Sequence, residues 1–292
     1  MNKDPNPAIP LTLIIPPGEF LLEDLKDFIL FGYYKSYSAF IESSKILGGK
    51  AHQLKGIIID NSGYPLSFLP LQKIPSGTPV YIYTGSIGDP SWLFENLDLL
   101  RSDCHILLPS GNPGSFTSVK FLASLGINCG IEFQDDRIDW DGVENVAGYI
   151  FTSEIPHGII EPFTYLLENY NPREYLDFNI ALLNTPLRFL YVDEELNIYP
   201  TRTAMLNNRK TGSGKEYLKN YPQTKEYRDL KFKWKDLFMS LNPCSTCPAF
   251  RICLGKFAGG DTDLVRCRSA FSKILEGIEN YKQNQTGIRV NG

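Results

Sequence analysis

Four of the six cysteines of this 292-residue chain lie close together, at Cys244, Cys247, Cys253 and Cys267. Their spacing is C-x2-C-x5-C-x13-C. Two thiolates that are separated by two residues can bind one metal without straining the backbone, and two further cysteines complete a four-thiolate site. Such a site suits an iron–sulfur cluster or zinc, and four ordinary reduced thiols are the remaining interpretation. Because four thiolates leave no open coordination position, we expect a structural or electron-relaying site.

The composition is that of an ordinary globular protein, with 42% hydrophobic and 21% charged residues. No apolar run approaches the roughly 18 to 20 residues of a membrane span, and the N-terminus carries no signal-peptide pattern. We therefore expect a cytoplasmic protein without a membrane partner, in which clustered cysteines are metal ligands more often than disulfides. The two other cysteines, Cys104 and Cys129, lie in apolar runs and are predicted to pack in the core.

The net charge of −4 divides unevenly along the chain. Residues 202–292 hold 17 Lys and Arg against 8 Asp and Glu, whereas residues 1–201 hold 12 against 25. Either the two parts carry complementary surfaces, or the basic part faces an acidic partner or offsets the charge of a thiolate site. The basic residues are interspersed with acids and match no groove-reading motif, so we do not expect nucleic acid as a partner.

Short apolar runs alternate with stretches of helical spacing in the first two-thirds of the chain. Each run ends in a turn signal, which is typical of buried strands in a parallel sheet. Strands are predicted at residues 11–15, 56–60, 80–84, 105–108, 129–133 and 147–152, and helices at residues 19–44, after Pro90, at residues 119–125 and at residues 162–170. The pattern predicts an α/β fold, either a partial βα barrel of about six parallel strands or an open doubly wound sheet. Both bind ligands at the carboxyl ends of the strands.

The pattern changes near residue 185. Apolar runs at residues 189–192 and 196–199, separated by a turn, predict an antiparallel hairpin. A Lys-rich helix at about residues 224–240, the cysteine stretch and a helix at about residues 264–283 follow. Residues 1–185 are thus predicted to form the barrel-like body, and residues 186–292 a small α+β domain that carries the cysteines.

The C-terminal part resembles a SPASM domain, the C-terminal module of radical-SAM enzymes that mature peptides. The resemblance rests on Ile198-Tyr199-Pro200-Thr201, which is similar to the end of the family's hairpin, on the helix at residues 234–240, and on the four-cysteine run. It implies that the four cysteines bind one 4Fe–4S cluster, the second auxiliary cluster of that family. Zinc in the same ligands is the alternative.

Other cysteines of the family pattern are missing. Thr201 and Phe257 stand where the family's first auxiliary cluster has ligands, and residues 202–243 contain no cysteine. The C-x3-C-x2-C motif of the radical-SAM cluster is also missing, because the cysteines before residue 201 are Cys104 and Cys129 alone. The resemblance therefore implies a pseudo-radical-SAM/SPASM protein with a partial barrel, one cluster and no use of S-adenosylmethionine.

Proteins of this type occur beside ATP-grasp ligases in systems that modify ribosomally made peptides, the arrangement called grasp-with-spasm. The resemblance thus implies an accessory protein that binds a precursor peptide and acts with a partner modifying enzyme, an ATP-grasp ligase. Two other interpretations stay open. One is an independent peptide-modifying enzyme that uses the barrel mouth near Gly85, Gly111 and His157, and the other is a structural adaptor held together by zinc.

Outside the cysteine stretch, His157 is the weak candidate for acid–base chemistry, with Glu132, Asp135 and Asp136 as the nearest carboxylates. A loop without a catalytic role is the alternative interpretation. The Gly-rich segment at residues 109–115 lies between a strand and a helix, where backbone N–H groups can hold an anion. It lacks the G-x-G-x-x-G fingerprint, and we interpret it as an ordinary turn.

Overall fold

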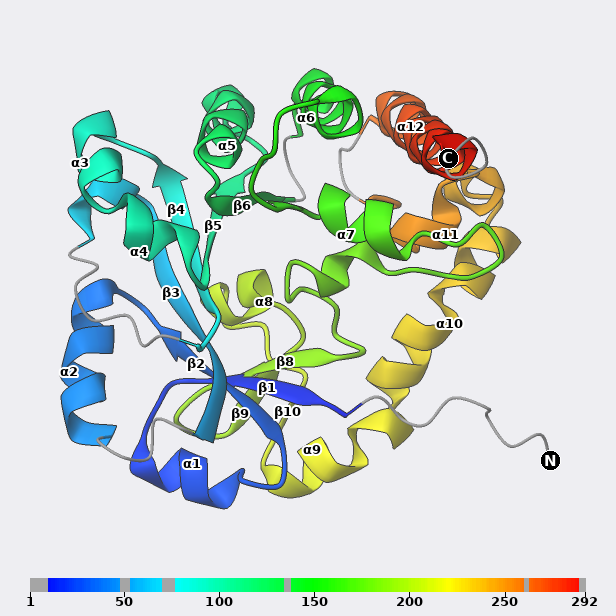
Figure 1. The fold of residues 1–292 in the computed structure, drawn as a ribbon. Coiled ribbons are helices and arrows are strands. Elements are labelled where there is room, and N and C mark those ends of the chain that lie inside the picture. Colours follow the sequence, from blue (N-terminus) through cyan, green and yellow to red (C-terminus); the bar gives the residue numbers. More distant parts are fainter. Residues whose placement is uncertain (1–9, 48–52, 70–76, 134–137, 260–262, 289–292) are drawn as a thin grey trace. The chain divides into compact units, whose positions relative to one another are not determined.

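The computed structural model describes residues 10–47, 53–69, 77–133, 138–259 and 263–288. Ten strands lie in these ranges, and hydrogen bonds order them β10-β9-β8-β1-β2-β3-β4-β5-β6-β7 (Figure 1). The predicted α/β fold with a mostly parallel sheet is therefore confirmed. The chain divides into two compact units, each made of several segments. The first comprises Met1–Asp60, Pro75–Tyr81 and Leu183–Phe232, and the second comprises the rest. The predicted domain boundary at residue 185 stays a prediction.

The first unit contains both parallel and antiparallel strands. They are β1 (Thr12–Ile15), β2 (Ile29–Tyr34), most of β3 (Leu54–Pro65), β8 (Phe189–Val192), β9 (Asn197–Tyr199) and β10 (Gly212–Ser213). β1 pairs in parallel with β2 and β8, and β2 with β3. β9 is antiparallel to β8 and β10, which confirms the predicted hairpin. The helices are α1 (Glu19–Asp24), α2 (Tyr37–Leu47), α8 (Arg202–Leu206), α9 (Lys215–Asn220), η4 (Tyr221–Gln223) and the first half of α10 (Lys225–Met239).

The second unit alternates strands and helices before the cysteine stretch. Its strands are the rest of β3 and most of β4 (Val80–Ser86), then β5 (Cys104–Pro109), β6 (Asn128–Glu132) and β7 (Ile160–Glu161). β6 pairs in parallel with both β5 and β7. Its helices are η2 (Leu66–Phe68), α3 (Pro90–Glu95), α4 (Leu97–Arg101), α5 (Pro113–Ser124), α6 (Trp140–Thr152), α7 (Phe163–Asn169), η3 (Phe178–Ile180), the end of α10, η5 (Pro243–Thr246), α11 (Phe250–Cys253) and α12 (Leu264–Ile288). Helix α6 lies between α5 and α12 and contacts both (Figure 1).

The single helix predicted at residues 19–44 is wrong. This region forms α1, then strand β2, then α2. The sequence of β2, ILFGYY, is rich in aromatic and apolar residues and fits a buried strand as well as one side of a helix. The pairing of this segment with β1 and β3 makes it a strand. Gly32 permits the side chain of Leu54 to approach the backbone of β2, because a Cβ at position 32 would lie 2.9 Å from Leu54 Cδ1.

The strand predicted at residues 147–152 is also wrong, because these residues are the last turns of α6. The buried residues of α6 lie three or four positions apart along one side, which is the period of a helix; they are Trp140, Val143, Val146, Ala147 and Ile150. Asp139 caps the helix by accepting a hydrogen bond from Gly142 N at 3.1 Å. The apolar run AGYIFT was therefore too short to distinguish a buried helix segment from a strand.

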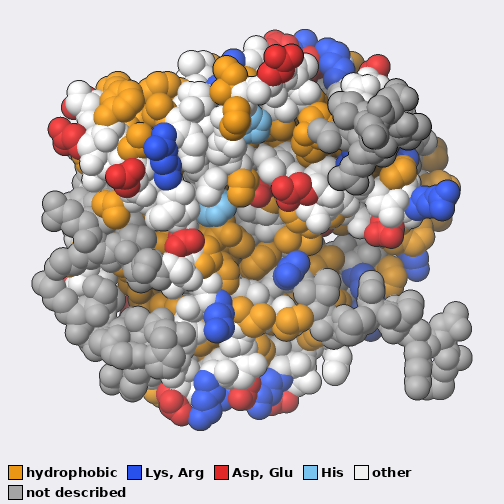
Figure 2. All heavy atoms as spheres, viewed as in Figure 1, with side chains coloured by type: hydrophobic (Ala, Val, Ile, Leu, Met, Phe, Trp, Pro, Cys, Tyr) orange, Lys and Arg blue, Asp and Glu red, His pale blue; other side chains and the backbone are white. Residues whose placement is uncertain are grey.

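Cys104 and Cys129 are fully buried in β5 and β6, as predicted. Among the described helices, none combines the length and the apolar character needed to cross a membrane. On the coloured part of the face shown in Figure 2, acidic and basic side chains are interspersed.

Candidate metal centre

Two short helices and the start of α12, all in the second unit, position the four cysteines. Cys244 lies in η5, Cys253 ends α11, and Cys267 lies in the first turn of α12, while Cys247 directly follows η5. Asn242 accepts a hydrogen bond from Cys244 N at 2.9 Å and so caps η5. Cys247 N donates to Cys244 O at 3.2 Å. The C-x2-C pair therefore forms the tight turn that its spacing predicts.

The four thiols line one small cavity of about 20 Å³, which is room for roughly one water molecule. All four cysteines are free of disulfides. The other described residues that line the cavity are apolar or basic: Pro243, Ala249, Phe257, Leu264, Arg268 and Phe271. The structure thus brings the four sequence-predicted cysteines to one place, without a competing carboxylate or imidazole among the described lining residues.

The thiols share this cavity without forming a finished coordination shell. The described residues include no group of three or more His, Cys, Asp or Glu side chains in an arrangement that holds a metal ion. A single zinc ion would need its four sulfur atoms about 2.3 Å from one point. A cluster spaces its thiolates more widely, because several iron and sulfide atoms lie between them. The donor set of four thiols fits either group chemically, and the identity of the metal stays a prediction.

Burial disfavours the thiolate form of Cys244, Cys253 and Cys267 in the absence of a cation. It raises the pKa of Cys253 to about 12 and also raises the pKa values of Cys267 and Cys244, and neighbouring thiols of the group add to each increase. Lys233 acts in the opposite direction on the pKa of Cys244, and its Nζ donates to Gly255 O at 2.9 Å. Because metal binding requires thiolates, uptake of a metal would release protons from this site.

An aromatic cluster forms one wall of the cavity, with Phe257 at its centre. The ring of Phe257 lies 5.6 Å from that of Phe133, 5.4 Å from Trp140, 6.3 Å from Phe178 and 5.8 Å from Phe271, between centroids. Phe257 is only 2% exposed. Phe257 therefore stabilises the core through ring contacts.

Thr201, the other position at which the sequence comparison expected a cysteine, lies in the first unit and caps α8. Its Oγ1 accepts a hydrogen bond from Ala204 N at 3.1 Å. Threonine is a favoured residue at the start of a helix, because its oxygen satisfies a backbone N–H that has no partner within the helix. Position 201 therefore has a structural role that a cysteine would fill poorly.

A buried ion pair in the first unit was not predicted from the sequence. Arg202 Nε and Nη2 donate to the two carboxylate oxygens of Asp60, at 2.9 and 2.7 Å. The two side chains are 6% and 8% exposed. Tyr33 OH donates to the same carboxylate, and burial together with Asp60 raises the pKa of Tyr33. The one available signal was a charged residue, Asp60, at the end of the apolar run GIIID.

The structure does not place His157 where the sequence suggested. His157 lies in the loop between α6 and β7, which leads to the amino end of a strand. The next residue, Gly158, packs against the segment just before β6. Its N–H donates to Ala123 O, and a Cβ added to Gly158 would lie only 2.3 Å from Ile127 O. His157 Nδ1 is 2.8 Å from Gly158 O, and its ring lies 5.5 Å from that of Tyr149. His157 is therefore on the opposite edge from the expected mouth, and the error follows from the wrong strand at residues 147–152.

The proposed mouth residues other than His157 do lie at the carboxyl ends of strands. Gly85 is near the end of β4 and Gly111 follows β5, and Asn112 Nδ2 donates to Gly85 O at 3.4 Å. Asn112 caps α5 by accepting from Gly114 N, so the segment 109–115 has the geometry of an ordinary helix-starting turn. Glu132 is buried at the carboxyl end of β6, whereas Asp135 and Asp136 lie outside the described residues. Glu132 therefore does not form an acid–base site with His157.

No family model matches the chain, and no curated protein matches it. Among solved structures, the chain is similar to SuiB from Streptococcus suis, with a TM-score of 0.42 and 10% sequence identity. The match covers 70% of this chain and 63% of that chain, so the chain spans less than two-thirds of this neighbour's length. The likeness is one of fold over the matched parts, and it assigns no activity to this chain.

Proposed function

We propose that this chain is an accessory protein of peptide maturation that carries one 4Fe–4S cluster. In this proposal it binds a precursor peptide and acts together with a separate modifying enzyme, an ATP-grasp ligase. The observation that carries the proposal is the convergence of Cys244, Cys247, Cys253 and Cys267 on one cavity, at the spacing of a SPASM domain. Strands β1 to β7 are neighbours in the sheet in the same order as in the chain, which supports a partial βα barrel as the body.

The residues at positions 201 and 257 support a single cluster. Thr201 caps a helix, and Phe257 is the centre of an aromatic cluster. Both residues contribute to folding without binding a ligand. The proposal therefore includes no first auxiliary cluster. A bound cluster would supply an electron-relaying or structural centre. The chain's own residues would hold it by four thiolates, shield it from water with Phe257 and Phe271, and offset its charge with Lys233 and Arg268.

Metal analysis of the anaerobically purified chain tests the cluster. We expect about four iron and four sulfide per chain, with the visible absorption of an iron–sulfur centre. Cys253→Ser should lose this iron, because it removes a thiolate from the cavity. Cys129→Ser is the matched control, since Cys129 is also buried but lies in β6. Zinc at about one per chain, lost in the same variant, would contradict the cluster and identify a zinc-held adaptor.

Binding of a peptide tests the second part of the proposal. The full chain, immobilised under anaerobic conditions, should retain a short peptide that is encoded next to it, and an ATP-grasp ligase encoded there should bind the resulting complex. A chain that contains its metal and yet retains no such peptide would contradict the accessory role. The independent-enzyme alternative lacks support from the geometry, because His157 is remote in the fold from the carboxyl ends of the strands.

A further inference from the structure

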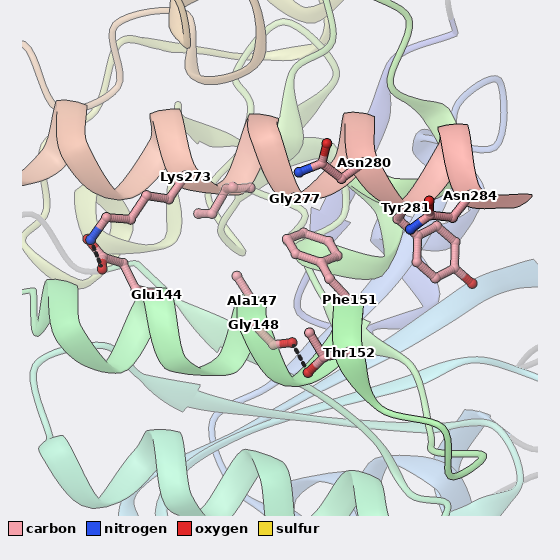
Figure 3. A pocket seen from close by; sticks show the side chains of 11 residues that line it. Glu144, Ala147, Gly148, Phe151, Thr152, Lys273, Gly277, Asn280, Tyr281 and Asn284 are labelled. Carbon is pink, nitrogen blue, oxygen red and sulfur yellow. Dashed lines mark hydrogen bonds and ion pairs between the residues drawn. The ribbon is translucent and has the colours of Figure 1, made fainter.

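A groove of about 420 Å³ runs between α6 and α12 in the second unit (Figure 3). Its floor is apolar and consists of Ala147, Phe151, Ile274 and Gly277. Phe151 extends from α6 toward α12, next to Gly277. A volume of this size lies within the range of about 300 to 1,000 Å³ that is usual for ligand sites, which also have mostly apolar walls.

Gly148 leaves the groove open. This residue lies inside α6, where glycine is among the least favourable residues. Two other glycines of these helices are required by packing. A Cβ added to Gly142 would lie 2.4 Å from the ring of Phe116, and a Cβ added to Gly277 would lie 2.4 Å from the ring of Phe151. At Gly148, in contrast, no described atom lies within 4 Å of an added Cβ. The packing of the chain therefore does not require glycine at position 148. The close approach of a bound ligand to the backbone of α6 would require it.

The polar groups of the groove carry no unbalanced charge. At one end, Lys273 Nζ pairs with Glu144 Oε2 at 2.6 Å. At the other end, Asn280 and Asn284 are exposed on α12 one turn apart (Figure 3). Thr152 Oγ1 donates to Gly148 O at 2.9 Å. A neutral groove with amide groups on its rim complements an uncharged ligand that has an apolar group and amides of its own. A charged ligand would bind more weakly, because no opposite charge in the groove would compensate for the loss of its hydration.

We propose that this groove binds an uncharged peptide segment, with one large apolar side chain over Gly148. The amides of Asn280 and Asn284 then bond to the backbone of the segment, since an amide side chain offers both a donor and an acceptor. This inference deepens the proposed function, on which it rests, by locating peptide binding on the outer face of α6 and α12. It makes no use of the cysteine site.

The test uses N-acetyl-phenylalanine N-methylamide, which is the minimal neutral peptide with an aromatic side chain. Titration into the full chain should shift the methyl NMR signals of Ile274 and Ala147, with a Kd on the order of a millimolar for a ligand of this size. N-acetyl-glutamate N-methylamide should bind at least roughly tenfold more weakly. Gly148→Leu should fill the groove and weaken binding of the phenylalanine probe by at least roughly tenfold.

Two variants control for folding and for surface hydrophobicity. Glu276→Leu places the same side chain at an exposed position of α12 that does not line the groove, and it should bind the probe like the wild type. Gly148→Ala should raise the melting temperature through better helix propensity and weaken binding less than Gly148→Leu. Unchanged binding in a folded Gly148→Leu variant, equal binding of the two probes, or no shift at Ile274 would each overturn the inference.

The same variants separate this inference from the proposed function. If the precursor peptide binds the wild type and Gly148→Leu equally well, the groove assignment is wrong while the accessory role stands. If the phenylalanine probe binds in the groove but no precursor peptide is retained, the groove is a peptide site and the accessory role is wrong. Loss of both in Gly148→Leu supports the two proposals together.

Discussion

Glu161, the last residue of β7, should make the stability of this protein fall as the pH rises from acid to neutral. The pKa of this carboxyl is raised from its ordinary value of 4.5 to about 7. Burial is the main cause and Glu168 adds to it, whereas the hydrogen bond from Tyr165 N, at 3.3 Å, lowers the pKa. One pKa unit corresponds to about 1.36 kcal/mol. The difference between 4.5 and 7 therefore corresponds to about 3 kcal/mol of lost stability once the folded protein must ionise Glu161.

The sign follows from proton binding. Between pH 4.5 and 7, the folded state holds a proton on Glu161 that the unfolded state has released, so the free energy of unfolding decreases across this window and is constant above it. Glu161→Gln cannot ionise, and its oxygen can still accept from Tyr165 N. We expect the variant to match the wild type at pH 4.5 and to exceed its stability by about 3 kcal/mol at pH 8.

Urea unfolding of both proteins across this pH range measures the difference directly. Glu154→Gln, which changes an exposed carboxyl of the same unit, controls for the loss of one negative charge. It retains Glu161, so its stability should fall with pH as that of the wild type does. A difference between Glu161→Gln and the wild type that stays constant with pH, or a Gln variant that is less stable at pH 8, would refute the reasoning.

Three further substitutions test the contacts described above, each by urea unfolding. Arg202→Ala should cost about 3 to 5 kcal/mol, because it leaves the carboxylate of Asp60 buried without its cation, and adding Asp60→Ala should restore part of the loss; no recovery in the double variant would contradict this account. Phe257→Ala should cost about 3 to 5 kcal/mol because it empties the centre of the aromatic cluster, and Phe257→Leu should cost clearly less. Thr201→Ala should cost about 1 kcal/mol by removing the cap of α8, whereas Thr201→Ser should be nearly neutral; equal stability of Thr201→Ala and the wild type would assign the cap no energetic role.

The cysteine stretch was predictable because its signal is local. The turn from Cys244 to Cys247 and the short connection to Cys253 determine most of the geometry by chain connectivity alone. Cys267 is more distant in the sequence, and its placement depends on how α12 begins. The aromatic wall could not be predicted in the same way, because Phe133, Phe178 and Phe257 come from separate segments that only the folded chain brings together.

The fold was predictable where apolar runs were short and bounded by turn signals, as for β1, β4, β5 and β6. It was not predictable where a run fitted two periods. The segment of β2 was assigned to a helix and the end of α6 to a strand, because strand pairing and helix packing, rather than local preference, decide such segments. The second error also displaced His157. The pair of Arg202 and Asp60 joins residues that are remote in sequence, so no spacing could indicate it.

Helix α12 joins two features that have been treated separately. Cys267 lies in its first turn, and Asn280 lies about 20 Å farther along at 1.5 Å per residue. If a metal group binds at Cys267 and a peptide binds at Asn280, as proposed, the first would order the start of the helix and the second its later turns. The two binding events would then share one loss of conformational entropy. Each should therefore tighten the other by the same factor. The occupied cysteine site would then be an effector of the groove, and slower amide hydrogen exchange along α12 would report the coupling.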